Sequence, residues 1–356
     1  MDCRGQAPRL YVALATVPGR EFSLQHAVAS LLEQQRPPDR LLVVAPPSFT
    51  VRKQGNTANP LTGHVNLSSL RTAPGLETHV CERDDGPGTK LLCALPRVLA
   101  LARGALDHSW IVVGDDDRVY NNWALARLQQ HICKTSTSSA GPRAFSFYTK
   151  GAWFPHARGD CFGPCVCTTR PPDCRKHCCF SRMYLRSRDE VSRLSWLSSQ
   201  TAPDLVLGQG ADLFAIPLRQ LQEVRSFFDC AVALETRISR HDDFWISAYL
   251  KLVHNMEIGQ VPAPHAPDGR FVAVGTSYVK NITWGAGGRI NRRARRKERL
   301  HDEKIALHLS SDWPDVLAAC AAHWDELLDR CANISAPRGT AKSNRLHLQL
   351  AGRYVL

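Results

Sequence analysis

The sequence predicts an α/β fold in which a mixed, mainly parallel sheet is flanked by helices. Two short apolar runs, Leu10–Ala15 and Leu41–Val44, have the composition of buried strands, and Ser23–Gln35 between them places apolar residues at helical spacing. A strand, a helix and a second strand in this order form a right-handed crossover with parallel strands. The β-branched run Ile111–Val113 is then followed by a second helical pattern over Trp123–Ile132. Such alternation is typical of sheets that bind ligands at the carboxyl ends of their strands.

The remaining elements follow from the same kinds of pattern. His79–Cys81 is predicted to be a short strand, Gly86–Ala102 a helix opened by a glycine-rich turn, and Ala144–Tyr148 a further strand. Asp204–Ile216 is apolar and contains two glycines, which indicates that its backbone closely approaches a ligand or another strand. His241–Leu250 begins a helix with carboxylates in its first turn, where the helix dipole stabilises them.

Composition and charge limit the class of protein. The chain has 356 residues, 44% of them hydrophobic and 22% charged, which is ordinary for a globular protein and excludes a disordered or fibrous one. The net charge of +12 favours anionic partners, although much of the excess lies in Arg289–Arg299. We divide the chain into a main domain over residues 8–260 and a basic, partly helical C-terminal extension over residues 261–356.

The sequence leaves two alternatives for the compartment. It contains no apolar stretch of about 18 residues, so we expect no transmembrane segment. The first nine residues lack the apolar core of a signal peptide. A complete N-terminus would indicate the cytoplasm, whereas a truncated one would allow the lumen of the Golgi or ER. Three glycosylation sequons lean toward the second alternative, at Asn66, Asn281 and Asn333.

Six of the 13 cysteines lie in the insertion Cys161–Cys179. In an oxidising compartment such a segment is a disulfide-linked loop, and in the cytosol it could bind zinc together with His177. The spacing does not match paired CxxC motifs, so we favour disulfides over zinc, with unpaired thiols as the third interpretation.

Three consecutive carboxylates, Asp115, Asp116 and Asp117, directly follow the Ile111–Val113 strand. Like charges this close repel one another, and burying them without a partner is costly. A divalent cation bound together with a polyanion would neutralise them, and oxygen ligands suit Mg²⁺ or Mn²⁺. The alternative is a solvated acidic turn, but the preceding strand favours a metal site.

Three further features belong with this triplet. Arg20 and Lys90 are cations in loops near strand ends, suited to a diphosphate or to the edge of a base and ribose, although single cations there are often plain surface charges. Asp242 or Asp243 could be a general base for an acceptor hydroxyl, although such a pair alone is often a helix cap. The ordered set is much less expected by chance than any member.

These motifs together resemble GT-A fold glycosyltransferases of the family-2-like and exostosin-like types. The similar segments are TVPGR, GPGTK, VVGDDDRVY, GQGADLF and HDDFWISAYL, and they extend over most of Leu10–Leu250. The Asp triplet resembles the DxD motif of this family. The resemblance implies a Rossmann-like sheet and transfer of a hexosyl or N-acetylhexosaminyl group from a nucleotide sugar, most simply UDP-linked, to a hydroxyl of a glycan, protein or lipid.

Carried over to this chain, the resemblance implies a role for each motif. Asp115 and Asp116 face the nucleoside, and Asp117 binds Mn²⁺ or Mg²⁺. The donor pocket is lined by Thr16, Pro18, Arg20 and Lys90, the acceptor side by Gly208 and Gly210, and the reacting hydroxyl lies near Asp242 or Asp243.

Two departures from the family pattern restrict what can be carried over. The Cys161–Cys179 insertion lies where acceptor-shaping loops would be, so the acceptor stays open. The histidine that often completes the metal site is not identified by the motifs; the candidates are His254, His265, His301 and His308. A base at Asp242 or Asp243 would mean inversion, but in retaining relatives this position contacts the acceptor, so the stereochemistry also stays open.

The main alternative is a nucleic-acid-binding protein, with Arg289–Arg299 on phosphates and a Cys-rich zinc module. The basic run lacks interleaved aromatic residues, with Trp284 alone nearby, so we expect no nucleic acid as a partner. A Mg²⁺-dependent phosphohydrolase would need a nucleophile or a second metal cluster that the motifs do not supply. A transferase-like protein without turnover is disfavoured by the intact aspartates at both sites.

Overall fold

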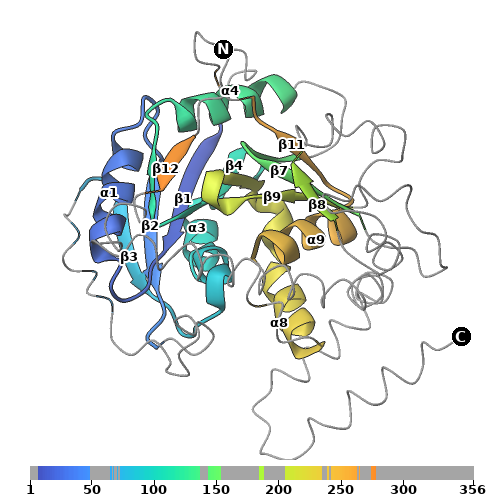
Figure 1. The fold of residues 1–356 in the computed structure, drawn as a ribbon, viewed down its shortest axis with the longest axis horizontal. Coiled ribbons are helices and arrows are strands. Elements are labelled where there is room, and N and C mark those ends of the chain that lie inside the picture. Colours follow the sequence, from blue (N-terminus) through green and yellow to red (C-terminus); the bar gives the residue numbers. More distant parts are fainter. Residues whose placement is uncertain are drawn as a thin grey trace, which may run out of the picture.

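The computed structural model describes residues 7–48, 65, 67, 70, 73–136, 143–153, 184–187, 205–234, 239, 242–262, 264 and 274–277, to which the structural statements below refer (Figure 1). The Cys161–Cys179 insertion, the basic run, the three sequons and the helical part expected in the C-terminal extension lie outside these residues. Among the described residues, no helix is long and apolar enough to cross a membrane.

Seven strands form the central sheet, which confirms the predicted mixed, mainly parallel α/β architecture. Their order is β11 (Glu257–Gln260), β6 (Arg143–Ser146), β10 (Phe214–Pro217), β4 (Ser109–Asp115), β1 (Arg9–Ala15), β2 (Arg40–Ala45) and β3 (Leu76–Val80). β1, β2, β3 and β4 run parallel, β11 is parallel to β6, and β10 is antiparallel to both of its neighbours.

Helices cover both faces of this sheet because its central strands are apolar on both sides. Residues of β1 alternate between two cores, with Leu10, Val12 and Leu14 in one and Tyr11, Ala13 and Ala15 in the other. The first core also includes α1 (Glu21–Leu32) and α4 (Ala124–Ser136), and the second includes α2 (Thr89–Leu92), α3 (Leu95–Leu101), α8 (Val224–Leu234) and α9 (Asp242–His254).

Shorter elements complete the described part. A three-stranded sheet has the order β8 (Tyr184–Ser187), β7 (Thr149–Trp153) and β9 (Leu205–Gly208), and β5 (Arg118–Tyr120) pairs with β12 (Gly275–Ser277). The 3-10 helices are η2 (Gly86–Gly88), η3 (Leu106–His108), η4 (Gly210–Asp212) and η5 (Leu218–Leu221).

The helix predicted over Gly86–Ala102 is wrong as a continuous element, because it is divided into η2, α2 and α3. Pro96 cannot donate a backbone hydrogen bond to Leu92, so α2 ends and a new helix starts at Leu95. Cys93, at this break, forms a disulfide with Cys81.

Two other boundaries differ from the prediction. β3 covers Leu76–Val80 rather than His79–Cys81; as an edge strand its residues are partly or fully exposed, so it lacks a continuous apolar run. Asp115 is the last residue of β4, so the Asp triplet begins inside the strand and only its last two members form the turn.

Candidate functional site

Three of the predicted segments meet at one edge of the sheet. β1 and β4 are parallel neighbours with Ala15 opposite Asp115, so the turn after β1 lies beside the turn after β4. β10 is antiparallel to β4, and the segment η4 that precedes it therefore reaches the same edge. This is the edge where the carboxyl ends of parallel strands leave room for a ligand.

Arg20, in the turn after β1, binds the second and third aspartates of the triplet. Its Nη1 lies 2.8 Å from Asp116 Oδ1 and 3.6 Å from Asp117 Oδ2. Burial lowers the pKa of Arg20, but these carboxylates more than offset that effect and raise it. Burial raises the pKa of Asp117, and the neighbouring Asp115 and Asp116 add to this increase while Arg20 opposes it.

Lys90, the second residue of α2, connects the triplet to α9. Its Nζ lies 2.8 Å from Asp115 Oδ1 and 2.8 Å from Asp242 Oδ2, and its side chain is only 7% exposed. The Asp242 contact has ion-pair distance but not hydrogen-bond geometry, because Asp242 Oδ2 has no hydrogen-bond partner. Burial alone would lower the pKa of Lys90, yet the surrounding carboxylates raise it well above its usual value. Burial would raise the pKa of Asp115, and Lys90 lowers it instead.

Asp243 has different partners from its neighbour. The Gly210 N–H donates to its Oδ1 over 2.8 Å, and the Ser247 hydroxyl donates to its backbone carbonyl over 2.6 Å. Burial and the adjacent charge of Asp242 raise the pKa of Asp243 to about 7, although Lys90 and the Gly210 amide act in the opposite direction. A carboxyl group with such a pKa can accept and release a proton near neutral pH.

The glycines of the GQGADLF segment allow close packing, as the sequence predicted. A Cβ at Gly208 would lie 2.5 Å from the ring of Phe214, and one at Gly210 would lie 2.7 Å from Lys90 Nζ. Both Lys90 and Asp243 therefore lie close to the backbone of Gly210, where a larger residue would not fit without a shift. The acceptor role given to these glycines stays a prediction.

Two buried polar atoms in the turns after β1 and β4 have no hydrogen-bond partner within the described structure. They are Thr16 Oγ1 and Asp116 Oδ2, on residues that are 0% and 2% exposed. Unpaired buried acceptors and donors are costly, so both atoms are candidates for contact with a bound molecule. In the sequence Pro18 lies between Thr16 and Arg20, and it is half-buried in a turn in which the Arg20 N–H donates to the Val17 carbonyl over 3.2 Å.

Several residues of the site were missed by the sequence reasoning. The Asp115 N–H donates to Tyr120 Oη over 2.8 Å, which ties β5 to the triplet. The Ser247 hydroxyl accepts the Gly208 N–H over 3.1 Å, and Arg118 lies 3.9 Å from Asp212. All lie inside or next to the quoted motifs, but their contacts depend on the tertiary arrangement.

The side chains at the sheet edge could bind a divalent cation only through a small number of protein ligands. Within the described residues, no three histidine, cysteine or carboxylate side chains cluster as a metal site, so the protein would supply few ligands. Mg²⁺ and Mn²⁺ sites of that kind take their other ligands from phosphate oxygens and water. The carboxylate of Asp117, partly exposed and next to an unpaired Asp116 oxygen, fits such a site.

Of the histidine candidates, only His254 lies among the described residues. It ends α9, whereas Asp242 begins that helix, so the two are separated by roughly 18 Å at 1.5 Å per residue. Its Nε2 lies 3.0 Å from Tyr249 Oη instead. His254 therefore does not join the cluster at the sheet edge.

Comparison with known proteins adds little. No family model and no curated protein matches the chain. Among solved structures, the chain is similar to S. aureus TarS 1-349, a glycosyltransferase, at 17% identity over 41% of each chain with a TM-score of 0.23. The chain thus spans less than half the length of that structure. A TM-score of this size establishes neither a common fold nor a common activity.

Proposed function

We propose that this protein is a metal-dependent glycosyltransferase that moves a sugar from a nucleotide donor, UDP-linked, to an acceptor hydroxyl on a glycan, protein or lipid. One observation carries the proposal: the Asp triplet, Arg20, Lys90, Gly210 and Asp243 come from five separate segments and meet at one sheet edge. The resemblance of the same segments to GT-A fold enzymes supports it.

In this proposal the donor lies at the ends of β1 and β4. Thr16 and Asp116 offer unpaired buried atoms for the polar edge of the nucleoside, and Arg20 offers positive charge for the diphosphate. Asp117 would hold Mn²⁺ or Mg²⁺, which would stabilise the charge that develops on the departing nucleoside diphosphate. Arg20 would then exchange part of its contact with Asp117 for the donor phosphates.

We assign the general base to Asp243 and not to Asp242. Asp242 is paired with Lys90 and buried, whereas Asp243 is partly exposed and has a pKa near neutrality. Ionised Asp243 would accept the proton of the acceptor hydroxyl as that oxygen attacks the sugar carbon, and the Gly210 N–H would hold the carboxylate in place. Direct attack of this kind inverts the configuration of the sugar.

The experiment that tests the proposal is calorimetric titration of the whole chain with UDP and with GDP, each with and without Mn²⁺. We expect UDP to bind in the presence of the metal, and Asp117→Ala to abolish this metal dependence. Asp107→Ala is the matched control, because Asp107 lies in η3 before β4, at the strand end away from the triplet, in an exposed ion pair with Arg219. Failure of both nucleotides to bind under all conditions would refute the proposal.

A further inference from the structure

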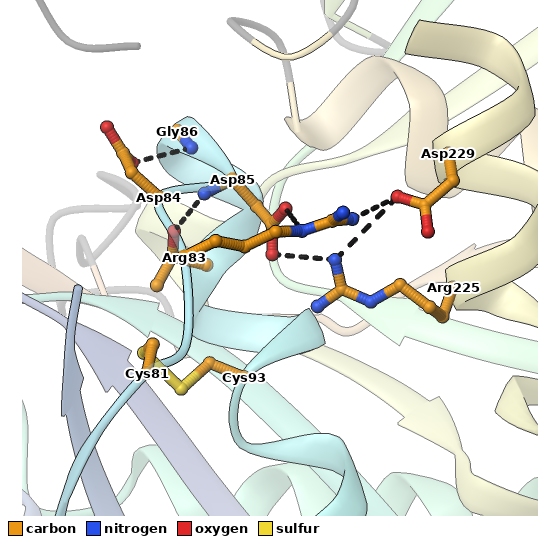
Figure 2. A network of polar contacts seen from close by, with 9 residues as sticks. Cys81, Arg83, Asp84, Asp85, Gly86, Cys93, Arg225 and Asp229 are labelled. Atoms are coloured by element: carbon orange, nitrogen blue, oxygen red, sulfur yellow. Dashed lines mark hydrogen bonds and ion pairs between the residues drawn. A yellow bond between two sulfur atoms is a disulfide. The ribbon is translucent and has the colours of Figure 1, made fainter. Parts of the chain in front are cut away.

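A second cluster of charges, separate from the strand-end site, surrounds Asp85 (Figure 2). The Asp85 side chain is 4% exposed, and each of its oxygens has a guanidinium partner: Arg83 Nε lies 2.8 Å from Oδ1 and Arg225 Nη1 lies 2.8 Å from Oδ2. Arg83 also binds Asp229, and Arg225 approaches Asp229 Oδ1 to 3.9 Å. Arg225 and Asp229 belong to α8, so the cluster joins that helix to the loop after β3.

The cluster is expected to contribute little to the free energy of unfolding. Asp85 is buried, and an ion pair of a buried carboxylate often contributes less stability than apolar side chains of the same volume. We therefore consider which part of the chain the cluster holds in place, and not how much it adds to the free energy of unfolding.

Asp85 holds the turn that leads directly to Lys90. Its N–H donates to Thr89 Oγ1 over 3.0 Å, and the next N–H, of Gly86, donates to Asp84 Oδ1 over 2.9 Å. Gly86 has a φ of +64°, a conformation that favours glycine. The turn thus has a single well-defined path into α2, and Thr89 at its end is 1% exposed.

Two further contacts restrict the same segment. A Cβ at Gly88 would lie 2.9 Å from Cζ2 of Trp245, so the turn packs directly against α9. The disulfide between Cys81 and Cys93 encloses the whole segment, with a sequence separation of 12 residues (Figure 2).

The helix on the other side of the cluster packs against α9 as well. The Phe228 and Trp245 rings have centroids 4.8 Å apart, and those of Phe227 and Tyr249 are 5.2 Å apart. α9 begins with Asp242 and Asp243. The ion pairs between α8 and Asp85 therefore connect the turn that holds Lys90 to the helix that holds these two aspartates.

We propose that Asp85 is a positioning residue that, through Arg83 and Arg225, keeps Lys90 at its place between Asp115 and the start of α9. That the positioned Lys90 serves catalysis rests on the proposed function, whereas the effect of Asp85 on the position of Lys90 does not. Asp85 acts through the turn and does not touch the strand-end site.

The test uses the Gly210 amide, which donates to Asp243 and therefore reports the ionisation of that carboxyl group. The charged groups that act on Asp243 are Asp242 on α9, Lys90 on α2 and Asp115 on β4. With ¹³C-glutamine and ¹⁵N-glycine labels, only Gln-Gly pairs give a selected NMR signal, and the chain has two of them, at Gly55 and Gly210. Asp243→Asn identifies the Gly210 signal by removing its titration.

We expect the Gly210 signal of the wild type to titrate with a midpoint near pH 7, the pKa of Asp243. In Asp85→Asn, Lys90 should move away and its charge should no longer lower that pKa, so the midpoint should rise by about half a pH unit or more. Asp107→Asn makes the same chemical change in the exposed pair with Arg219 and should keep the wild-type midpoint.

A folded Asp85→Asn variant with the wild-type midpoint would overturn the proposal. If this variant does not fold, Arg83→Gln replaces it, since Arg83 is 52% exposed and its loss leaves no buried cation behind. Arg83→Gln should shift the midpoint in the same direction, and an unchanged midpoint would again overturn the proposal. The measurement needs neither nucleotide nor metal, so it can succeed where the calorimetric test of the function fails, and the reverse.

Discussion

Replacing Asp243 by asparagine should make the protein more stable relative to the wild type as the pH rises. The pKa of Asp243 lies near 7 in the folded protein against an ordinary value of 3.8, because burial and Asp242 disfavour its charge. Between about pH 4 and pH 7 the folded protein keeps this proton and the unfolded chain has lost it. The stability of the wild type therefore falls over this range as the pH rises, and becomes constant above it. Asparagine has no proton to lose and removes this dependence.

The size of the effect follows from the pKa difference. At about 1.4 kcal/mol per pH unit, the wild type loses about 2–3 kcal/mol at this group between pH 5 and pH 8. Asp243 is partly exposed, so solvent screening reduces the expected value to about 2 kcal/mol. Any change in packing or hydrogen bonding caused by asparagine is the same at both pH values and cancels in the comparison.

Urea unfolding of the wild type and of Asp243→Asn at pH 5 and pH 8 gives the four free energies needed. The stability difference between variant and wild type should be about 2 kcal/mol larger at pH 8. Asp107→Asn, in the exposed pair with Arg219, should show a much smaller change. An equal difference at both pH values, or a larger one at pH 5, would refute the electrostatic description of Asp243 and with it the assignment of the base.

Three other predictions concern the surroundings of Lys90. Lys90→Met leaves Asp115 and Asp242 without their cation and should cost about 3–5 kcal/mol in urea unfolding. This loss should not fall between pH 6 and pH 9, because the pKa of Lys90 is well above its usual value and Lys90 stays charged in both the folded and the unfolded chain over this range. The loss should instead grow somewhat with pH, because Asp243 ionises near pH 7 and also loses the cation that lowers its pKa; a loss that falls within this range would contradict this. Gly210→Ala places a Cβ 2.7 Å from Lys90 Nζ and should lower the free energy of unfolding by about 1–3 kcal/mol, whereas an unchanged urea midpoint would show that Lys90 is not confined there. Replacing Cys81 and Cys93 together by serine should cost about 3 kcal/mol, from the chain entropy of the opened loop, and a wild-type urea midpoint would argue against the disulfide.

The sheet could be predicted from the sequence because its signals are local. β1, β2 and β4 are buried on both faces, so they are continuous apolar runs. α1 buries one side, so its apolar residues recur at helical spacing. β3 and the helix over Gly86–Ala102, which is divided into η2, α2 and α3, were predicted less well. An exposed edge strand has no such run. The break in the helix did have a local signal, Pro96, which the helical pattern around it outweighed, whereas the disulfide at this break depends on Cys81 in another segment.

The residues of the site could be predicted as a group but not by their individual contacts. The rule that ligands bind at strand ends was enough to place Arg20 and the triplet together. It could not show that Lys90 would be shared by Asp115 and Asp242, nor that Asp243 would differ from its neighbour, since both depend on how α2 and α9 pack. Asp85 gave no signal at all, because a short acidic turn in a sequence looks the same whether it is solvated or buried.

The charges at the sheet edge are divided in a way that suits the proposed reaction. Arg20 is paired with Asp116 and Asp117, and Lys90 is paired with Asp115 and Asp242, while the hydrogen bond to the Asp243 carboxylate comes from a neutral backbone amide. A nucleotide and metal arriving at Asp117 would therefore change the contacts of Arg20 first. Lys90, buried and fixed by two carboxylates, would keep acting on Asp243. We infer that donor binding and the proton affinity of the base are separated by this arrangement, so that Asp243 can respond to the acceptor.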